Sequence, residues 1–122
     1  PEEVERDLHL LGLVGLQDPP RPDVADALAA CRRAGVRVAM VHDSGASTRR
    51  GERVRRWFPD ADLVVFGHSH LPEHEVGPGG QVRFNPGSPT QRRRAPWRSF
   101  GELHVDGGRI VSLLHRRVAA DG

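Results

Sequence analysis

Residues 36–70 of the chain read VRVAMVHDSGASTRRGERVRRWFPDADLVVFGHSH and contain two short apolar segments separated by a polar stretch. Residues 36–41 form a near-continuous apolar run and residues 63–66 form a second, which is typical of strands buried in a parallel sheet. The polar stretch between them predicts a helix over about residues 46–57. A strand, a helix and a strand in this order favour a right-handed crossover that makes the two strands parallel.

The chain before this stretch predicts one more strand and one more helix. Residues 7–16, with an apolar run from Leu8 to Val14, predict the strand. The helix begins at Pro22, which suits the first helical position, and ends before Gly35, a natural residue after a helix C-terminus. Its apolar face follows the helical spacing of Val24, Ala27, Leu28 and Cys31.

Beyond residue 72 the pattern changes to hairpins. Turn residues at 77–80 separate two short strands, residues 75–76 and 81–84, and turn residues at 106–108 separate residues 99–105 from residues 109–115. An irregular turn, NPGSP at residues 85–89, lies between the hairpins. The predicted fold is therefore α/β, with a partial parallel β-α-β-α-β sheet followed by an antiparallel β meander.

Composition and length narrow the class of protein. The 122 residues suffice for a single domain, residues 1–122, that buries roughly two-thirds of its unfolded surface. All 18 basic residues are arginine, and the net charge of +2 is too small to indicate nucleic-acid binding by itself. The one cysteine, Cys31, excludes a disulfide framework and a thiolate zinc site.

No segment approaches the roughly 20 apolar residues that a membrane span needs, and the acidic start of the chain does not suit a signal peptide. We therefore expect a cytoplasmic protein with no membrane partner. Because the chain begins with Pro1 rather than methionine, we also expect that a segment precedes it.

Three histidines follow the two central strands. His42 comes directly after residues 36–41, and His68 and His70 come just after residues 63–66. The carboxyl ends of parallel neighbours meet at one sheet edge with a spacing of about 4.8 Å, so imidazoles from both strands can reach one metal ion. We expect no ligand role for the other four histidines, because His74 has no partner at ligand spacing and the rest lie in strand patterns, namely His9, His104 and His115.

Residues 41–118 resemble the C-terminal half of a calcineurin-like metallophosphoesterase of the bacterial phosphodiesterase type. The resemblance is carried by VHDSG at 41–45, FPDADLVVFGHSH at 58–70, FNPGSPT at 84–90 and SFG at 99–101. It implies half of a metallophosphoesterase sandwich, and it implies that His42, His68 and His70 are metal ligands. In that family such histidines help hold two divalent metals, commonly manganese, iron or zinc, and a bridging hydroxide attacks a phosphodiester or phosphomonoester.

Residues 7–41 resemble another family, the P-type cation ATPases. The segments LGLVGLQDPPRP at 11–22 and CRRAGVRVAMV at 31–41 are similar to the DPPR region of the ATPase phosphorylation domain. The motifs of the phosphorylated aspartate and of magnesium binding are absent, so the chain cannot form a phosphoenzyme. We likewise expect none of the phosphoesterase motifs DxH, GD and GNHD in residues 1–40. The sequence thus predicts a hybrid single domain.

Several functions follow from these features. The first is a metal-dependent phosphoesterase that acts on a phosphate ester with one bound ion and with weak or absent turnover, since anionic ligands for a second ion are missing. Asn85 and Arg92 are candidates for contact with the substrate phosphate. The alternatives are a non-catalytic interaction module of the same fold and a truncated ATPase phosphorylation domain.

The Arg92-Arg93-Arg94 run with Trp97 also raises nucleic-acid binding, although a solvated loop explains such a run more simply. We expect nucleic acid as a partner only in the role of substrate. The sequence leaves open whether copies of the chain form a homo-oligomer.

Overall fold

A computed structural model describes residues 23–119 of the chain. The helices are α2 (Val24–Arg33) and α3 (Arg50–Trp57), with one 3-10 turn, η1 (Pro78–Gly80). The strands are β1 (Val38–Val41), β2 (Leu63–Phe66), β3 (Glu73–Val76), β4 (Val82–Asn85), β5 (Ser99–Asp106) and β6 (Arg109–Arg117). The predicted strand over residues 7–16 lies outside the described residues.

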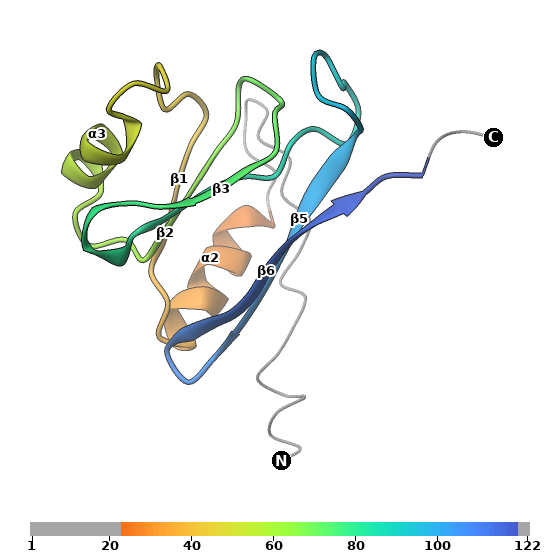
Figure 1. The fold of residues 1–122 in the computed structure, drawn as a ribbon. Helices are drawn as coiled ribbons and strands as arrows, with labels where there is room; N and C mark the ends of the chain where they lie inside the picture. Colours follow the sequence, from red (N-terminus) through yellow and green to blue (C-terminus); the bar gives the residue numbers. More distant parts are fainter. Residues whose placement is uncertain (1–22, 120–122) are drawn as a thin grey trace.

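Four strands form a mixed sheet in the order β1-β2-β4-β3, and β5 and β6 form a separate two-stranded sheet (Figure 1). β1 and β2 pair in parallel, as the central sequence stretch predicts, with Val41 opposite Phe66. β4 also pairs in parallel with β2, and β3 closes the sheet in antiparallel fashion. The predicted α/β class with a parallel sheet and antiparallel hairpins is therefore confirmed.

The predicted meander is divided between the two sheets. Because the buried Phe84 packs with Leu63 of β2, the β3–β4 hairpin belongs to the main sheet, while residues 86–98 carry the chain to the second sheet. The second hairpin turns at Gly107 and Gly108, both at positive φ, and such tight two-residue turns favour glycine.

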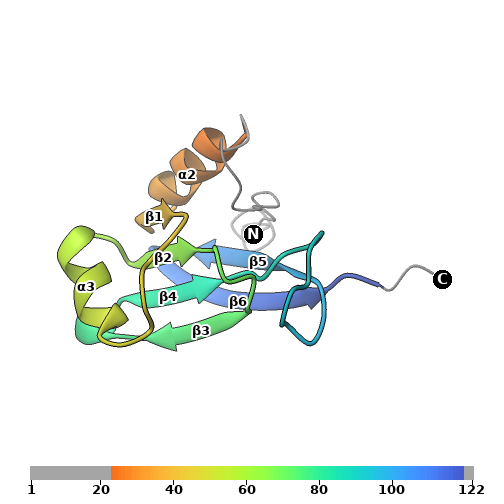
Figure 2. The ribbon, with the colours of Figure 1, turned by 90° about the horizontal axis from the view of Figure 1, so that it is seen from above.

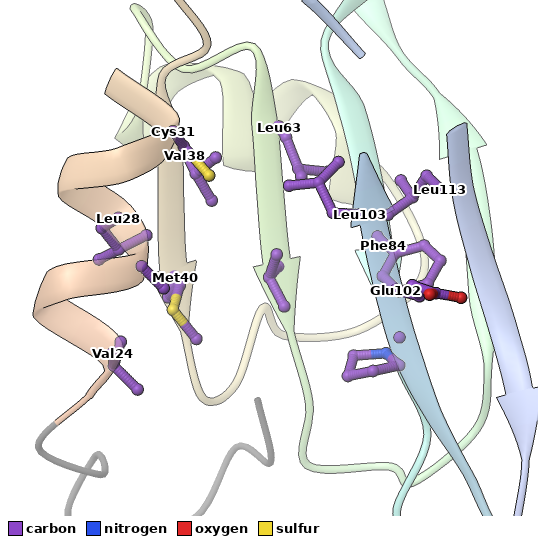
Figure 3. A pocket seen from close by; sticks show the side chains of 14 residues that line it. Val24, Leu28, Cys31, Val38, Met40, Leu63, Phe84, Glu102, Leu103 and Leu113 are labelled. Atoms are coloured by element: carbon purple, nitrogen blue, oxygen red, sulfur yellow. The ribbon is translucent and has the colours of Figure 1, made fainter. Parts of the chain in front are cut away.

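The core lies between the main sheet and the β5–β6 hairpin. Leu63, Phe84 and Leu113 are buried there, and apolar residues of both sheets pack against them. Helix α2 covers the same face of the sheet beside β1 (Figure 2). An apolar cavity of about 70 Å³ separates Leu28 and Cys31 of α2 from the hairpin residues Leu103 and Leu113 (Figure 3).

The opposite face of the sheet is covered by α3. Val64 and Phe66 of β2 are buried, as is Val54 of α3, and the Arg50 guanidinium lies 4.8 Å from the centre of the Phe66 ring. The helix predicted over residues 46–57 begins only at Arg50. Arg49 has a positive φ of 58°, so the helix cannot extend continuously to residue 46.

Helix α2 agrees with the sequence prediction. It spans Val24–Arg33, and Gly35 follows it at a φ of 87°. No helix among residues 23–119 has the length and apolar character needed to cross a membrane.

Candidate metal centre

The backbone brings the two polar clusters together at one edge of the main sheet. His42 directly follows β1, and its carbonyl accepts a hydrogen bond from the N–H of Gly67 at 2.9 Å. Gly67 in turn follows β2, the parallel neighbour of β1. The histidines after the two strands are thus held side by side by the same register that pairs the strands.

The side chains of His42 and His68 face each other. His42 Nε2 and His68 Nδ1 are 3.3 Å apart, and the two rings meet edge to face with centroids 5.3 Å apart. Both side chains are exposed to solvent. Two exposed imidazoles from adjacent strand ends are therefore within hydrogen-bond distance of each other.

The loop that carries His68 and His70 has an unusual backbone. Both histidines lie in the left-handed region, with φ values of 72° and 66°. Such values are uncommon for residues other than glycine and persist where the surroundings enforce them. The buried side chain of Asn85 does so here, because its amide nitrogen donates to the Gly67 carbonyl at 3.3 Å and contacts the Ser69 hydroxyl at 3.2 Å.

His70 contacts the loop after β4. Its Nδ1 lies 2.7 Å from the backbone carbonyl of Gln91. A nitrogen in this position carries the proton, which leaves Nε2 as the acceptor or ligand atom, and histidines that bind metals commonly donate to a carbonyl in this way. The described structure does not bring His70 Nε2 into a common group with His42 and His68.

Among residues 23–119, Asp43 supplies a carboxylate beside this pair. Its Oδ2 lies 4.0 Å from Nε2 of His68, and its Oδ1 accepts a hydrogen bond from the N–H of Gly45. Across residues 23–119, no group of three or more histidine, cysteine, aspartate or glutamate side chains is arranged to hold a metal ion. The site is therefore a histidine pair with a carboxylate beside it.

The geometry of this pair fits one metal ion. Two nitrogens bound to a tetrahedral ion at about 2.0–2.1 Å are separated by about 3.3 Å. The observed separation of His42 Nε2 and His68 Nδ1 is 3.3 Å. The separation matches the spacing of two nitrogen ligands on one ion, and it is also the hydrogen-bond distance at which the two imidazoles now contact each other.

The two predicted substrate contacts lie in different surroundings. Asn85 is fully buried, and its Oδ1 accepts from the N–H of Gly87, so its side chain acts on the histidine loop and the turn after β4. Arg92 is exposed, and its guanidinium reaches the carbonyl of Pro96 at 3.4 Å. Contact of Arg92 with substrate stays a prediction, and for Asn85 such contact would require its present hydrogen bonds to break.

Two residues at this site were not predicted from the sequence. Arg93 donates from its guanidinium to the His68 carbonyl at 2.8 Å, and Gln91 offers its carbonyl to His70. Both lie more than 20 residues from the histidines they contact. Only the arginine run was visible in the sequence as a signal, and it did not indicate which of its members would turn toward the site.

The remaining described histidines take part in packing. The His115 ring stacks on Phe84 with a centroid distance of 4.4 Å, and His74 meets the same ring edge to face. His104 lies 3.3 Å from the carboxylate of Glu102. His9 lies outside the described residues. Asp7-Leu8-His9 has the letters of the DxH motif, so the expectation that residues 1–40 contain none of the three phosphoesterase motifs is wrong for DxH.

The main sheet, the β5–β6 hairpin packed against it and the histidines at two adjacent strand ends define a protein of the phosphoesterase fold. The calcineurin-like phosphoesterase superfamily domain matches residues 17–108, which is most of the chain. The chain belongs to this superfamily.

Among solved structures, the chain is similar to a Thermotoga maritima protein determined by solution NMR. The two are 27% identical, with a TM-score of 0.53, and the match covers 85% of this chain and 64% of that protein. The chain is also similar to Vps29 of Entamoeba histolytica in complex with zinc, at 25% identity and a TM-score of 0.44, over 61% of this chain and 47% of Vps29.

Curated relatives support the resemblance to P-type cation ATPases. A calcium-transporting ATPase of Bacillus subtilis is 43% identical over 67 residues, 54% of this chain and 8% of the ATPase. An endoplasmic reticulum calcium ATPase of Aspergillus fumigatus is 46% identical over 46 residues, 38% of this chain and 5% of the ATPase. The chain thus spans less than a tenth of the length of these relatives.

Proposed function

We propose that the chain is a metal-dependent phosphoesterase-family protein that holds one divalent ion on His42 and His68. The observation that carries this proposal is the 3.3 Å separation of the two facing imidazole nitrogens. Neutral imidazoles suit zinc and iron better than manganese, which prefers oxygen ligands. We therefore rank zinc and iron above manganese, and one ion above two.

The surrounding residues supply orientation and charge. Asn85 holds the histidine loop in its left-handed conformation, and Arg93 fixes the carbonyl of His68. Asp43 adds a carboxylate beside this pair, with its Oδ2 4.0 Å from Nε2 of His68. Exposed Arg92, close in sequence to Arg93, supplies positive charge for a phosphate ester.

A divalent ion at such a site polarises a phosphoryl oxygen and acidifies coordinated water. With two histidine ligands and no carboxylate at ligand distance among residues 23–119, the affinity for the ion is modest and hydrolysis is slow. Weak turnover, rather than full phosphodiesterase activity, is the expected behaviour of this chain.

The alternative is a non-catalytic interaction module of the same fold. It is favoured by the absence of a three-ligand group in the described part of the chain. A truncated ATPase phosphorylation domain is a weaker alternative, because the chain lacks the aspartate that would be phosphorylated. We place the protein in the cytoplasm, in keeping with the free, buried thiol of Cys31.

The test is zinc titration of metal-stripped protein by calorimetry, together with hydrolysis of a bis-aryl phosphate. His68→Ala should abolish zinc binding, whereas His74→Ala, an exposed histidine on β3 outside the site, should leave it unchanged. Equal zinc binding by both variants would overturn the metal site. Zinc binding without hydrolysis would support the interaction module over the enzyme.

A further inference from the structure

The loop between β4 and β5 carries a concentration of positive charge. Between Pro86 and Arg98 there are four arginines and no aspartate or glutamate. Within residues 23–119, none of the four forms an ion pair with a carboxylate. We call residues 90–98 the arginine arm.

An aromatic residue lies among the arginines of this arm. Trp97 is 36% exposed, and the guanidinium of Arg117, from the end of β6, lies 4.3 Å from the centre of its ring. An open groove of about 740 Å³ runs along this part of the surface and is lined by Arg92, Trp97, Arg98 and Arg117. Thr90, Pro96, Val118 and Ala119 complete its lining without adding a negative charge.

The arm is attached directly to the histidine site. Arg93 donates to the His68 carbonyl at 2.8 Å, and Gln91 accepts from His70 at 2.7 Å. The arm is also tied to the second sheet, because the N–H of Val118 donates to the Arg98 carbonyl at 2.8 Å. The arm thus contacts the histidine loop through Arg93 and Gln91. The groove itself lies along Arg92, Trp97 and Arg98 and reaches Arg117 at the end of β6.

We propose that the arginine arm binds single-stranded nucleic acid, with its phosphodiester backbone on the arginines and a base against Trp97. Its role as the substrate arm of the histidine site rests on the proposed function, whereas the binding itself rests on the arm alone. Guanidinium groups neutralise successive phosphates, and an exposed aromatic side chain among them provides a stacking surface for bases of any sequence.

Nucleic acid fits this surface better than a membrane or an acidic peptide. The exposed part of the arm offers one aromatic ring among arginines rather than an apolar patch that could insert into lipid. An acidic peptide would bind the arginines through its carboxylates, and its binding would not depend on the indole ring of Trp97. The contribution of Trp97 therefore separates the three kinds of partner.

The experiment measures the binding of a fluorescent oligothymidylate of roughly 10 nucleotides by anisotropy, in the presence of a metal chelator. The test variant is Arg92→Gln with Arg94→Gln and Arg98→Gln. The control removes the same charge elsewhere, through Arg32→Gln, Arg33→Gln and Arg37→Gln, all exposed near the C-terminus of α2. Trp97→Leu is measured alongside.

The arm variant should weaken binding about tenfold or more, and it should reduce the salt dependence, whose slope for single strands is about −0.7 for each phosphate neutralised. Trp97→Leu should weaken binding about tenfold, while the charge-matched control should change it less than about threefold. Equal loss in the arm variant and the control would overturn the proposal. So would an unchanged affinity in Trp97→Leu, or tighter binding to phosphatidylserine vesicles than to the oligonucleotide.

The two proposals fail separately. Oligonucleotide binding by a native chain that binds no zinc would remove the metal site and keep the arm. Zinc binding with no affinity for the oligonucleotide would remove the arm and keep the metal site.

Discussion

The side-chain amide of Asn85 donates a hydrogen bond to the backbone carbonyl of Gly67, 3.3 Å away, and Asn85 is completely buried. One side chain from the end of β4 thereby fixes the loop at the end of β2, where His68 follows. The conformation of the candidate metal site depends on this link between two residues that are 18 positions apart in the sequence.

Asn85→Ala should lower the free energy of unfolding by about 1–3 kcal/mol, because it leaves buried partners of the amide unsatisfied. The same substitution should weaken zinc binding, since the histidine loop loses its anchor. Urea unfolding and calorimetry measure the two effects. Thr90→Ala, at an exposed position of the next turn, is the control, and equal behaviour of the two variants would contradict the anchoring role.

Arg53→Lys should loosen the loop between β1 and α3. The Arg53 guanidinium donates to the carbonyls of Ser44, Ala46 and Thr48, and a single ammonium group cannot span all three. We expect faster hydrogen exchange in residues 44–48 and a loss of about 1–2 kcal/mol of stability. Arg56→Lys, at an exposed position on the same helix, should change stability by less than about 0.5 kcal/mol. Unchanged exchange in Arg53→Lys would refute the explanation.

Gly35→Ala should be more destabilising than Gly107→Ala, although both glycines have positive φ. A Cβ at Gly35 would lie 2.7 Å from the Cα of Gly108, whereas a Cβ at Gly107 would meet nothing within 4 Å. The clash would separate α2 from the hairpin, which are joined by the hydrogen bond from Gly108 N–H to the Ala34 carbonyl. We expect a difference of about 2 kcal/mol in unfolding free energy. Equal losses would show that only the backbone conformation matters.

Glu102 should make the stability depend on pH in the acid range. The hydrogen bond from Arg116 holds the pKa of this carboxyl below its usual value, burial opposes the shift, and His104 adds to the lowering. A lowered folded-state pKa contributes stability above the unfolded value of about 4.3, and that contribution is lost as pH falls through the folded pKa.

The native chain should therefore be more stable to thermal unfolding than Glu102→Gln near neutral pH, and this difference in stability should shrink as pH falls. Glu52→Gln supplies the comparison, because the side chain of Glu52 is 69% exposed and lies 4.0 Å from Arg49. A gap between the native chain and Glu102→Gln that does not change with pH would contradict this assignment.

Several elements could be read directly from the sequence. The helical spacing from Val24 to Cys31 predicts α2, and the continuous apolar runs predict β1 and β2 with their parallel pairing. The predicted start of α3 at residue 46 is too early. The polar residues 46–49 are compatible with a helix, but in the folded chain the Arg53 guanidinium donates hydrogen bonds to the carbonyls of Ala46 and Thr48. A local sequence pattern predicts where a helix or strand forms. It cannot predict where α3 begins, because that start depends on the contact of Arg53 with the loop before the helix.

The sequence by itself determined the two strands that are followed by histidines, because a short apolar run is a local signal that needs only a few neighbouring residues. That His42 and His68 share a sheet edge follows from the same local signals. Only the tertiary structure decided that Asn85 is buried under the histidine loop, that His70 turns to Gln91, and that Arg93 reaches His68. These contacts join the loop after β2 to residues 85–93, and long-range hydrogen bonds of this kind depend on the packing of the whole sheet.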